Sequence, residues 1–233
     1  MHNILEFDEL NSTNTYVKEN AAALSDKTAV VALRQYSGRG RFDRTWVSDE
    51  GGLYFTLVLK PAKTDFLHNL TQLMCVSVCT AVNAYGLKSY IKWPNDVHIN
   101  KQKICGILSE AVIKDGKFYA LALGTGINVG QAAVNGVNQS ATSLKEQGVE
   151  VGRQDILNAV LNNFFSLYED VINNGFAAIS EQYRQLFPFL GTQVTLSAQG
   201  NITGLAAGIS DLGELILLTP EGKEIKVLTG EII

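Results

Sequence analysis

The chain has 233 residues, of which 46% are hydrophobic and 18% charged, and its formal net charge is −4. This length allows one large core, or one core with a small second domain, and the composition is typical of a folded globular chain. The negative net charge argues against a general electrostatic grip on nucleic acid, and no apolar run of the sequence reaches the ~20 residues of a membrane span. The first residues are acidic where a signal peptide would be basic, so we expect a cytoplasmic protein with no membrane partner.

The cysteine content also indicates a cytoplasmic protein. Three cysteines fit a reducing compartment better than a disulfide scaffold. A zinc site built on Cys75 and Cys79 would need two more ligands, and no histidine has a suitable spacing. We therefore expect these two residues and Cys105 to pack in the core.

The first 130 residues predict a sheet with packed helices. A short strand at 3–10 is followed by a helix that begins at Ser12 or Thr13 and runs into alanines. Apolar residues at helical spacing predict a second helix that Gly86 ends. The remaining segments are β-branched or aromatic runs separated by turn residues, and we expect strands near 27–35, 51–60, 89–93, 96–100, 103–113 and 118–129. The expected result is an antiparallel or mixed sheet.

The pattern changes in the C-terminal part of the chain. Apolar residues at helical spacing predict a helix from 153 to Asn174, followed by a second helix at 176–187 that stops before Pro188. Short strands broken by glycine then predict a small β-barrel. We expect two domains, 1–188 and 189–233.

The loop between the strands expected at 27–35 and 51–60 carries the arginines Arg39, Arg41 and Arg44 around Gly38 and Gly40. It lacks the third glycine and the following helix of a dinucleotide-binding turn, and no Gly-Lys-Ser/Thr ends it as in a phosphate-binding P-loop. An ordinary solvated turn is an open alternative. The spacing would also let several guanidinium groups fold over phosphate or carboxylate oxygens.

A second polar cluster lies between Lys92 and Glu110. Trp93-Pro94 predicts an extended turn, after which Asn95 and Asp96 present oxygens suited to magnesium or to a substrate amine. A turn capped by an Asx side chain is the structural alternative. The presence of this polar cluster in the same chain as a cationic loop favours a binding site.

The combination of motifs resembles the biotin-protein ligases. Members of that family show Ser-Thr-Asn after the first strand, Gly-Arg-Gly-Arg followed by Trp, Lys-Trp-Pro-Asn-Asp followed by Lys and Gly-Ile-Leu, and a later Gly-x-Gly-x-Asn. All four motifs occur here in family order, and the similarity continues into the C-terminal segment, so it covers nearly the whole chain. The matching segments are Ser12 to Asn14, Gly38 to Arg41 with Trp46, Lys92 to Asp96 with Lys103 and Gly106 to Leu108, and Gly124 to Asn128.

The resemblance implies an α+β fold, with a class II synthetase-like catalytic domain and a small C-terminal SH3-like β-barrel. It implies an enzyme that activates biotin with ATP and Mg²⁺ to biotinyl-AMP and then transfers biotin to a lysine of a biotin carboxyl carrier domain. A homodimer is also expected as a possibility of the family. The alternatives left open are a lipoate-protein ligase of the same fold and a non-catalytic biotin sensor.

The resemblance also implies roles for individual residues. Lys103, Arg41 and Asp96 would be catalytic. The biotin site would comprise Ser12, Thr13, Asn14, Gln35, Gly38, Arg39, Lys103 and Gly106. The ATP site would comprise Arg39, Arg41, Arg44, Trp46, Lys92, Asn95 and Asn128. Asn95 and Asp96 would hold Mg²⁺.

Two positions depart from the family pattern. Asp43 stands where many relatives have glycine, and Ala141 falls where some carry a tryptophan that stacks on adenine. Both departures bear on adenine packing and loop closure. Relatives that act as repressors carry an N-terminal winged helix-turn-helix, whereas this sequence starts at the first catalytic strand, so DNA is not an expected partner.

Overall fold

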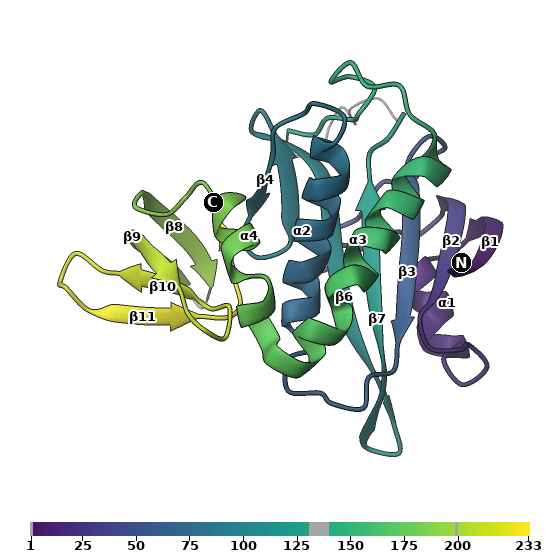
Figure 1. The fold of residues 1–233 in the computed structure, drawn as a ribbon, viewed down its shortest axis with the longest axis horizontal. Helices are drawn as coiled ribbons and strands as arrows, with labels where there is room; N and C mark the ends of the chain where they lie inside the picture. The colour runs from purple at the N-terminus through teal and green to yellow at the C-terminus, as the bar shows by residue number, and fades with distance from the viewer. Residues whose placement is uncertain (1, 131–139, 199) are drawn as a thin grey trace.

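The computed structural model describes residues 2–130, 140–198 and 200–233 and contains two sheets (Figure 1). The larger sheet has seven strands in the order β1-β2-β3-β7-β6-β5-β4. Its first pair, β1 and β2, is parallel, and the other neighbours are antiparallel. The strands are β1 (Asn3–Leu10), β2 (Thr28–Gln35), β3 (Leu53–Leu59), β4 (Ser89–Lys92), β5 (Asp96–Ile99), β6 (Gln102–Lys114) and β7 (Lys117–Ile127).

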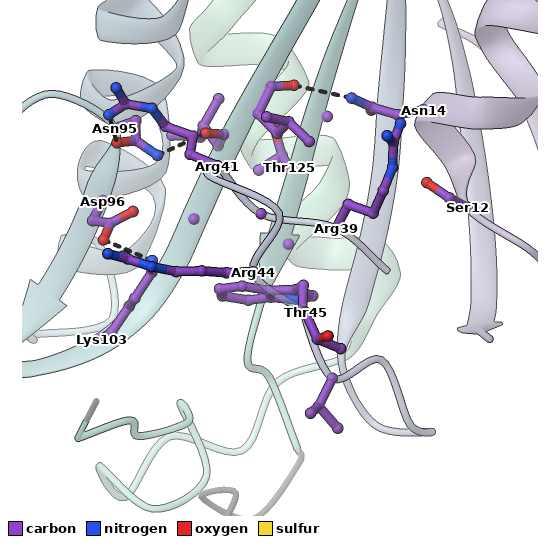
Figure 2. A pocket seen from close by; sticks show the side chains of 18 of the residues that line it. Ser12, Asn14, Arg39, Arg41, Arg44, Thr45, Asn95, Asp96, Lys103 and Thr125 are labelled. Atoms are coloured by element: carbon purple, nitrogen blue, oxygen red, sulfur yellow. Dashed lines mark hydrogen bonds and ion pairs between the residues drawn. The ribbon is translucent and has the colours of Figure 1, made fainter. Parts of the chain in front are cut away.

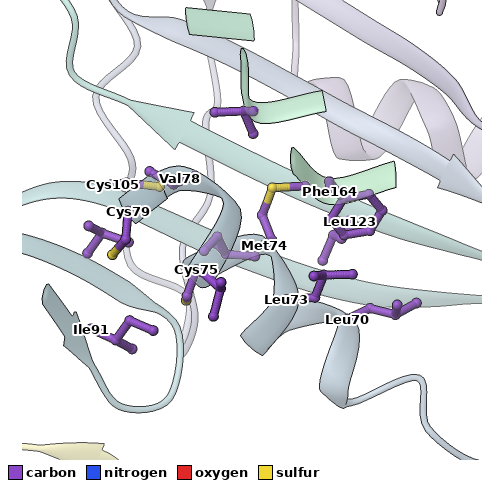
Figure 3. Packing of buried hydrophobic residues seen from close by; sticks show 14 of the residues in the cluster. Leu70, Leu73, Met74, Cys75, Val78, Cys79, Ile91, Cys105, Leu123 and Phe164 are labelled. Atoms are coloured by element: carbon purple, nitrogen blue, oxygen red, sulfur yellow. The ribbon is translucent and has the colours of Figure 1, made fainter. Parts of the chain in front are cut away.

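Two long helices cover one face of this sheet, α2 (Asn69–Asn83) and α3 (Arg153–Asn174) (Figure 1). Alternation along the strands explains the packing, because Leu53, Phe55 and Leu57 of β3 all point toward the main core. Leu70 and Leu73 of α2 pack into the same core (Figure 3). Cys75 and Cys79 of α2 also lie there, as expected from the sequence. Gly175 ends α3 with φ +63, as a helix C-terminus favours.

The opposite face of the sheet packs against α1 (Thr13–Asn20). The intervening residues of the strands, such as Val30 and Val58, form a smaller cluster there with Val17 of α1. Beyond this cluster the same face presents Thr56, Gly124 and Gly126, whose side chains are small or absent. That change leaves room for a cavity above the sheet.

The C-terminal part forms a five-stranded antiparallel sheet in the order β11-β10-β9-β8-β12. Its buried residues, including Leu196, Leu215 and Leu217, belong to the same apolar cluster as the helices of the larger sheet. Hydrogen bonds from Asn69 and Gln72 of α2 to the turn at Leu212 and Gly213 hold it in place. The strands are β8 (Gln193–Ala198), β9 (Gly200–Ile209), β10 (Leu215–Leu218), β11 (Glu224–Val227) and β12 (Glu231–Ile232).

The expected fold class is confirmed: a mixed sheet with packed helices, followed by a small antiparallel β unit. Two local expectations were wrong. The first helix ends at Asn20, so the alanines lie in a turn. The expected helix at 176–187 is instead a 3-10 turn (Gly175–Ala178) and the short helix α4 (Ser180–Gln185), because Ile179 has φ −125 and interrupts the helical path. Among the described residues, no helix has the length and hydropathy of a membrane span.

Candidate active site

A cavity of about 590 Å³ lies on the α1 side of the large sheet (Figure 2). The arginine loop covers it, β6 and β7 form its floor, and Glu231 of β12 reaches it from the C-terminal sheet. In Figure 2, Ser12, Asn14 and Arg39 lie toward one end of the cavity, whereas Asn95, Asp96 and Lys103 lie toward the other. The first end therefore combines uncharged polar groups with Arg39, and the second holds the charges of Asp96 and Lys103.

Short-range hydrogen bonds shape the arginine loop. The amide of Gly40 donates to the carbonyl of Arg44 at 2.7 Å, and the amide of Trp46 donates to the carbonyl of Gly38 at 2.9 Å. At the tip, Phe42 and Asp43 both have positive φ values of 55 and 56. Asp43 thus adopts a conformation that glycine would reach more easily, and aspartate is among the residues that tolerate it. The family departure at position 43 is compatible with this turn.

Trp46 lies directly over two glycines of the cavity floor. A Cβ atom at Gly126 would lie 2.5 Å from Trp46 Nε1, and one at Gly106 would lie 2.9 Å from Trp46 Cζ3. Gly106 and Gly126 are register partners on β6 and β7, so together they form a flat platform for the ring. The Nζ atom of Lys103 lies 5.3 Å from the Trp46 ring centroid, within the range of a cation–π contact.

A connected set of uncharged groups lines the end next to α1. Gln35 Oε1 accepts hydrogen bonds from the backbone amide of Thr13 at 2.8 Å and from its hydroxyl at 3.1 Å, and Gln35 Nε2 donates to Ser48 Oγ at 2.9 Å. The Thr56 hydroxyl lies 2.6 Å from Asn14 Oδ1 and 2.8 Å from Thr13 Oγ1. Thr13, Asn14 and Thr56 are all buried, so their orientations are fixed before any ligand arrives.

Glu110 of β6 borders this end. Its carboxylate accepts hydrogen bonds from Lys18 Nζ at 2.6 Å, Asn14 Nδ2 at 2.8 Å and Arg39 Nη2 at 3.2 Å. Burial raises the pKa of Glu110, but the hydrogen bonds from Lys18 and Asn14 outweigh burial, and the pKa is lowered below its usual range. The carboxylate is therefore ionised at neutral pH.

The other two arginines of the loop reach toward the C-terminal sheet. Arg41 Nη1 donates to Asn95 Oδ1 and to the carbonyl of Gly230, both at 2.9 Å. Arg44 Nη1 forms an ion pair of 2.8 Å with Glu231 Oε1. Burial lowers the pKa of Arg41, whereas the hydrogen bond to Glu231 raises that of Arg44. These contacts tie a loop of the large sheet to the last strand of the chain.

Lys103 and Asp96 form a buried ion pair at the charged end. Lys103 Nζ lies 2.6 Å from Asp96 Oδ2, and the two side chains are 15% and 6% exposed. Burial raises the pKa of Asp96, although Lys103 opposes the change. Asp96 Oδ1 is buried and has no hydrogen-bond partner among the described residues. It is therefore free to accept from a ligand.

Asn128 and Ala141 close the cavity beside Lys103. Asn128 Nδ2 donates to the carbonyl of Thr142 at 3.0 Å, and Lys103 pairs with Ala141 in an isolated β-bridge. Both Asn128 and Ala141 line the cavity. Ala141 contributes no ring at this position, so no aromatic stacking surface comes from this residue.

Most of the residues predicted from the sequence meet in this one cavity. Gly38 and Lys92 are the two that the described structure places outside its lining. A Cβ at Gly38 would lie 2.3 Å from the Trp46 carbonyl, so this glycine is needed for close packing of the loop. Lys92 pairs with Asp96 across β4 and β5 and acts on the site through its charge. The predicted residues in the lining are Ser12, Thr13, Asn14, Gln35, Arg39, Arg41, Arg44, Trp46, Asn95, Asp96, Lys103, Gly106 and Asn128.

Several groups at this site were not predicted from the sequence. Glu110 was named only as the end of a motif, and Glu231 lay in a segment interpreted as structural. Thr56 sits within an apolar strand, where the single polar residue in "LYFTLVL" was the available signal. Thr125, whose buried hydroxyl has no partner among the described residues, lies between the glycines of "GTGIN".

Comparison with known proteins shows the family to which the chain belongs. Residues 6–128 match the model of the family described as "Biotin/lipoate A/B protein ligase family". Residues 189–233 match the model described as "Biotin protein ligase C terminal domain". The biotin–[acetyl-CoA-carboxylase] ligase of Paracoccus denitrificans is 33% identical over 229 residues, which cover 92% of this chain and 94% of that protein. The chain belongs to the biotin protein ligase family.

Two further relatives and one solved structure show how far the biotin protein ligase similarity extends. The bifunctional ligase/repressor BirA of Bacillus subtilis is 34% identical over 231 residues, covering 94% of this chain and 70% of the relative. The chain spans 62% of the length of the corresponding Bacillus spizizenii protein. The solved structure of the Aquifex aeolicus biotin protein ligase in complex with biotin and ATP has a TM-score of 0.88 and 33% identity, and the match covers 100% of this chain and 98% of that one.

Proposed function

We propose that this protein is a biotin-protein ligase that makes biotinyl-AMP from biotin and ATP and then transfers biotin to a lysine of a biotin carboxyl carrier domain. The observation that carries the proposal is that a fixed polar network adjoins Arg41, Arg44 and Lys103 within one cavity. The similarity to a ligase solved with biotin and ATP supports the same assignment.

The biotin site occupies the end of the cavity next to α1. A rigid ureido ring needs fixed hydrogen-bond partners, and Ser12, Thr13 and Gln35 supply them. Asn14 shapes this end, whereas Gly106 lies beside Lys103, where the biotin carboxylate would reach. Gly38 allows the loop to pack closely over the cavity. Arg39 and Lys103 bind the biotin carboxylate between the two ends.

The nucleotide occupies the charged end. Arg41 and Arg44 contact the phosphates, Trp46 and Asn128 border the nucleotide, and Asn95 supports Arg41 through the hydrogen bond of 2.9 Å. Lys92 contributes positive charge from outside the lining. Arginine suits this role because its fork of N–H groups matches phosphate oxygens.

In the first step, the biotin carboxylate attacks the α-phosphorus of ATP, and pyrophosphate leaves. Both reactants are anions, so the main obstacle is their mutual repulsion. Lys103 lies where its ammonium group meets both anions, and Arg41 stabilises the charge that builds on the α-phosphate. The ion pair with Asp96 holds Lys103 in this orientation.

In the second step, the amine of the carrier lysine attacks the mixed anhydride, and AMP leaves. The amine must lose a proton to react. Asp96 Oδ1 is a buried acceptor without a partner among the described residues, and it lies beside Lys103 at the charged end of the cavity. Its raised pKa makes Asp96 a better base than an exposed carboxylate. Asp96 therefore orients and deprotonates the incoming lysine.

The donor set fits Mg²⁺ in part. Asp96 Oδ1 can accept a cation, whereas Asn95 Oδ1 already accepts a hydrogen bond from Arg41. The described residues contain no cluster of three or more candidate metal ligands, and Mg²⁺ commonly takes one or two carboxylates with substrate phosphates and water. Asp96, assisted by Asn95 if Arg41 moves to a phosphate, would hold the ion. Magnesium neutralises the phosphate charge when bound.

Three broader assignments complete the proposal. Residues 1–188 form the catalytic domain, and residues 189–233 form the C-terminal domain. The protein acts in the cytoplasm, where its carrier partner is a biotin-dependent carboxylase. A homodimer is part of the same proposal and is testable by sedimentation.

The test is pyrophosphate exchange into ATP, with biotin and lipoate compared at equal concentration. Exchange that depends on biotin supports the ligase, and exchange with lipoate alone would assign the related lipoate chemistry. Biotin binding without exchange would instead identify a sensor.

A further inference from the structure

We propose that Glu110 is a positioning residue whose carboxylate holds the guanidinium of Arg39 in place to receive the carboxylate of biotin. The inference rests on the proposed function, because it concerns the same cavity and takes biotin as the ligand. It adds a residue that contacts the biotin-binding groups rather than the reacting atoms.

The contact geometry carries the first step. Arg39 Nη2 lies 3.2 Å from both carboxylate oxygens of Glu110. Arg39 is on a loop flanked by Gly38 and Gly40, its side chain is 41% exposed, and Glu110 is its ion-pair partner among the described residues. A long exposed side chain on such a loop has many rotamers, and fixing them costs entropy. The pairing with Glu110 meets that cost before the ligand binds.

The same carboxylate also orients a second group of the site. Asn14 Nδ2 donates to Glu110 Oε2 at 2.8 Å and to the carbonyl of Leu108 at 3.1 Å. The amide nitrogen is therefore directed at β6, and Asn14 Oδ1 is turned toward the Thr56 hydroxyl at 2.6 Å. Glu110 thus contacts both the polar network and the arginine that are assigned to biotin.

The charges around Glu110 explain why a carboxylate is needed. Lys18 of α1 lies 2.6 Å from Glu110 Oε1, so two cations share one anion. The triad keeps a net positive charge, which favours a ligand carboxylate beside Arg39. A neutral side chain at position 110 would leave Lys18 and Arg39 without their common partner, and their repulsion would move the more mobile Arg39.

The experiment compares Glu110→Gln with the wild type by calorimetric titration of biotin and of its alcohol analogue, in which CH₂OH replaces the carboxylate. The wild type is expected to prefer biotin. Glu110→Gln is expected to reduce that preference by roughly three- to tenfold, since partly exposed ion pairs contribute modestly. Any effect through Asn14 weakens the binding of both ligands alike. The ratio of the two affinities therefore isolates the effect through Arg39.

Three control variants sharpen the result. Glu169→Gln removes another Lys–Glu pair, of 2.7 Å with Lys27, away from the cavity, and should leave the preference unchanged. In an Arg39→Ala background, Glu110→Gln should produce no further loss of preference. Glu110→Asp, which keeps the negative charge, should retain part of the preference for biotin over its alcohol analogue.

An unchanged preference in folded Glu110→Gln, or an equal loss for both ligands, would overturn the inference. If that variant does not fold, ¹⁵N relaxation of the Arg39 guanidinium in the wild type decides instead: restricted motion is expected, and free reorientation would overturn the inference. A wild type that binds no biotin would overturn the proposed function. Biotin binding and ligation with an unaffected preference in the variant would overturn only the role of Glu110.

Discussion

Replacing Lys103 by methionine removes the cation that pairs with buried Asp96, and two consequences should follow. The Nζ–Oδ2 distance is 2.6 Å and the side chains are 15% and 6% exposed, so the pair is largely shielded from water. Leaving one partner of a buried pair alone costs about 3–5 kcal/mol. Lys103→Met should therefore lower the free energy of unfolding by an amount near the bottom of this range, because Asp96 can take up a proton.

The second consequence is catalytic. An ammonium group between two converging anions matters most in the transition state, so Lys103→Met should slow biotinyl-AMP formation by about a hundredfold or more while weakening biotin binding much less. Single-turnover quench measurements of adenylate formation give the rate, and urea denaturation gives the stability. The double variant Lys103→Met/Asp96→Asn should regain most of the lost stability but none of the lost rate.

The outcome that refutes this reasoning is equally specific. Adenylate formation at the wild-type rate in folded Lys103→Met would remove Lys103 from the reaction. A double variant no more stable than the single one would show that the ion pair does not account for the cost.

The remaining predictions concern the arginine loop, the glycine platform and a buried histidine. Arg41→Gly should still form the adenylate but release it about tenfold faster or more, because a charge-assisted hydrogen bond is lost; filter binding and a blot for stray biotinylation test this, and equal release rates would contradict it. Gly126→Ala places a methyl group where Trp46 lies, at 2.5 Å from Nε1, and should weaken ATP binding by roughly tenfold or more in calorimetry, whereas Gly40→Ala, with 3.6 Å to its nearest neighbour, should change it little. Burial lowers the pKa of His98 to about 4 from 6.5, so unfolding takes up a proton between these values; stability is fully present above pH 6.5 and is lost as pH falls toward 4. Between pH 7 and pH 5 the wild type should lose about 2 kcal/mol more of unfolding free energy than His98→Gln, and identical losses would show that His98 does not titrate in this way.

Local structure was predictable where single residues determine the backbone. The strands expected at 96–100 and 103–113 are joined by a hairpin through Asn100 and Lys101, both with positive φ, and Asp115 and Gly116 turn the next hairpin in the same manner. Helix α3 ends at Gly175 as its sequence indicates. In each case the signal lies within a few residues of the feature.

The arrangement of the sheet was less accessible. The last strand of the large sheet in sequence order, β7, is inserted between β3 and β6, and β1 pairs with β2 in parallel. These pairings depend on how whole faces are buried, and a pattern along one strand does not select its neighbour. The sequence therefore predicted the strands but not their order.

In the site, too, the local features were predictable from the sequence and the contacts between distant residues were not. The arginines were identifiable from their spacing, but their partners lie far away: Glu110 is 71 residues from Arg39, and Glu231 is 187 residues from Arg44. Isolated glutamates carry no local signal of such contacts. The platform under Trp46 likewise arises from Gly106 and Gly126 on different strands, and only their register brings them together.

The central claim is most directly tested by incubating the protein with biotin, MgATP and a purified biotin carboxyl carrier domain and analysing the carrier by mass spectrometry. The account predicts one biotin per carrier, attached at a single lysine, only when both biotin and ATP are present, and greatly reduced by Lys103→Met. A carrier that stays unmodified under these conditions, or one that accepts lipoate and not biotin, would contradict it.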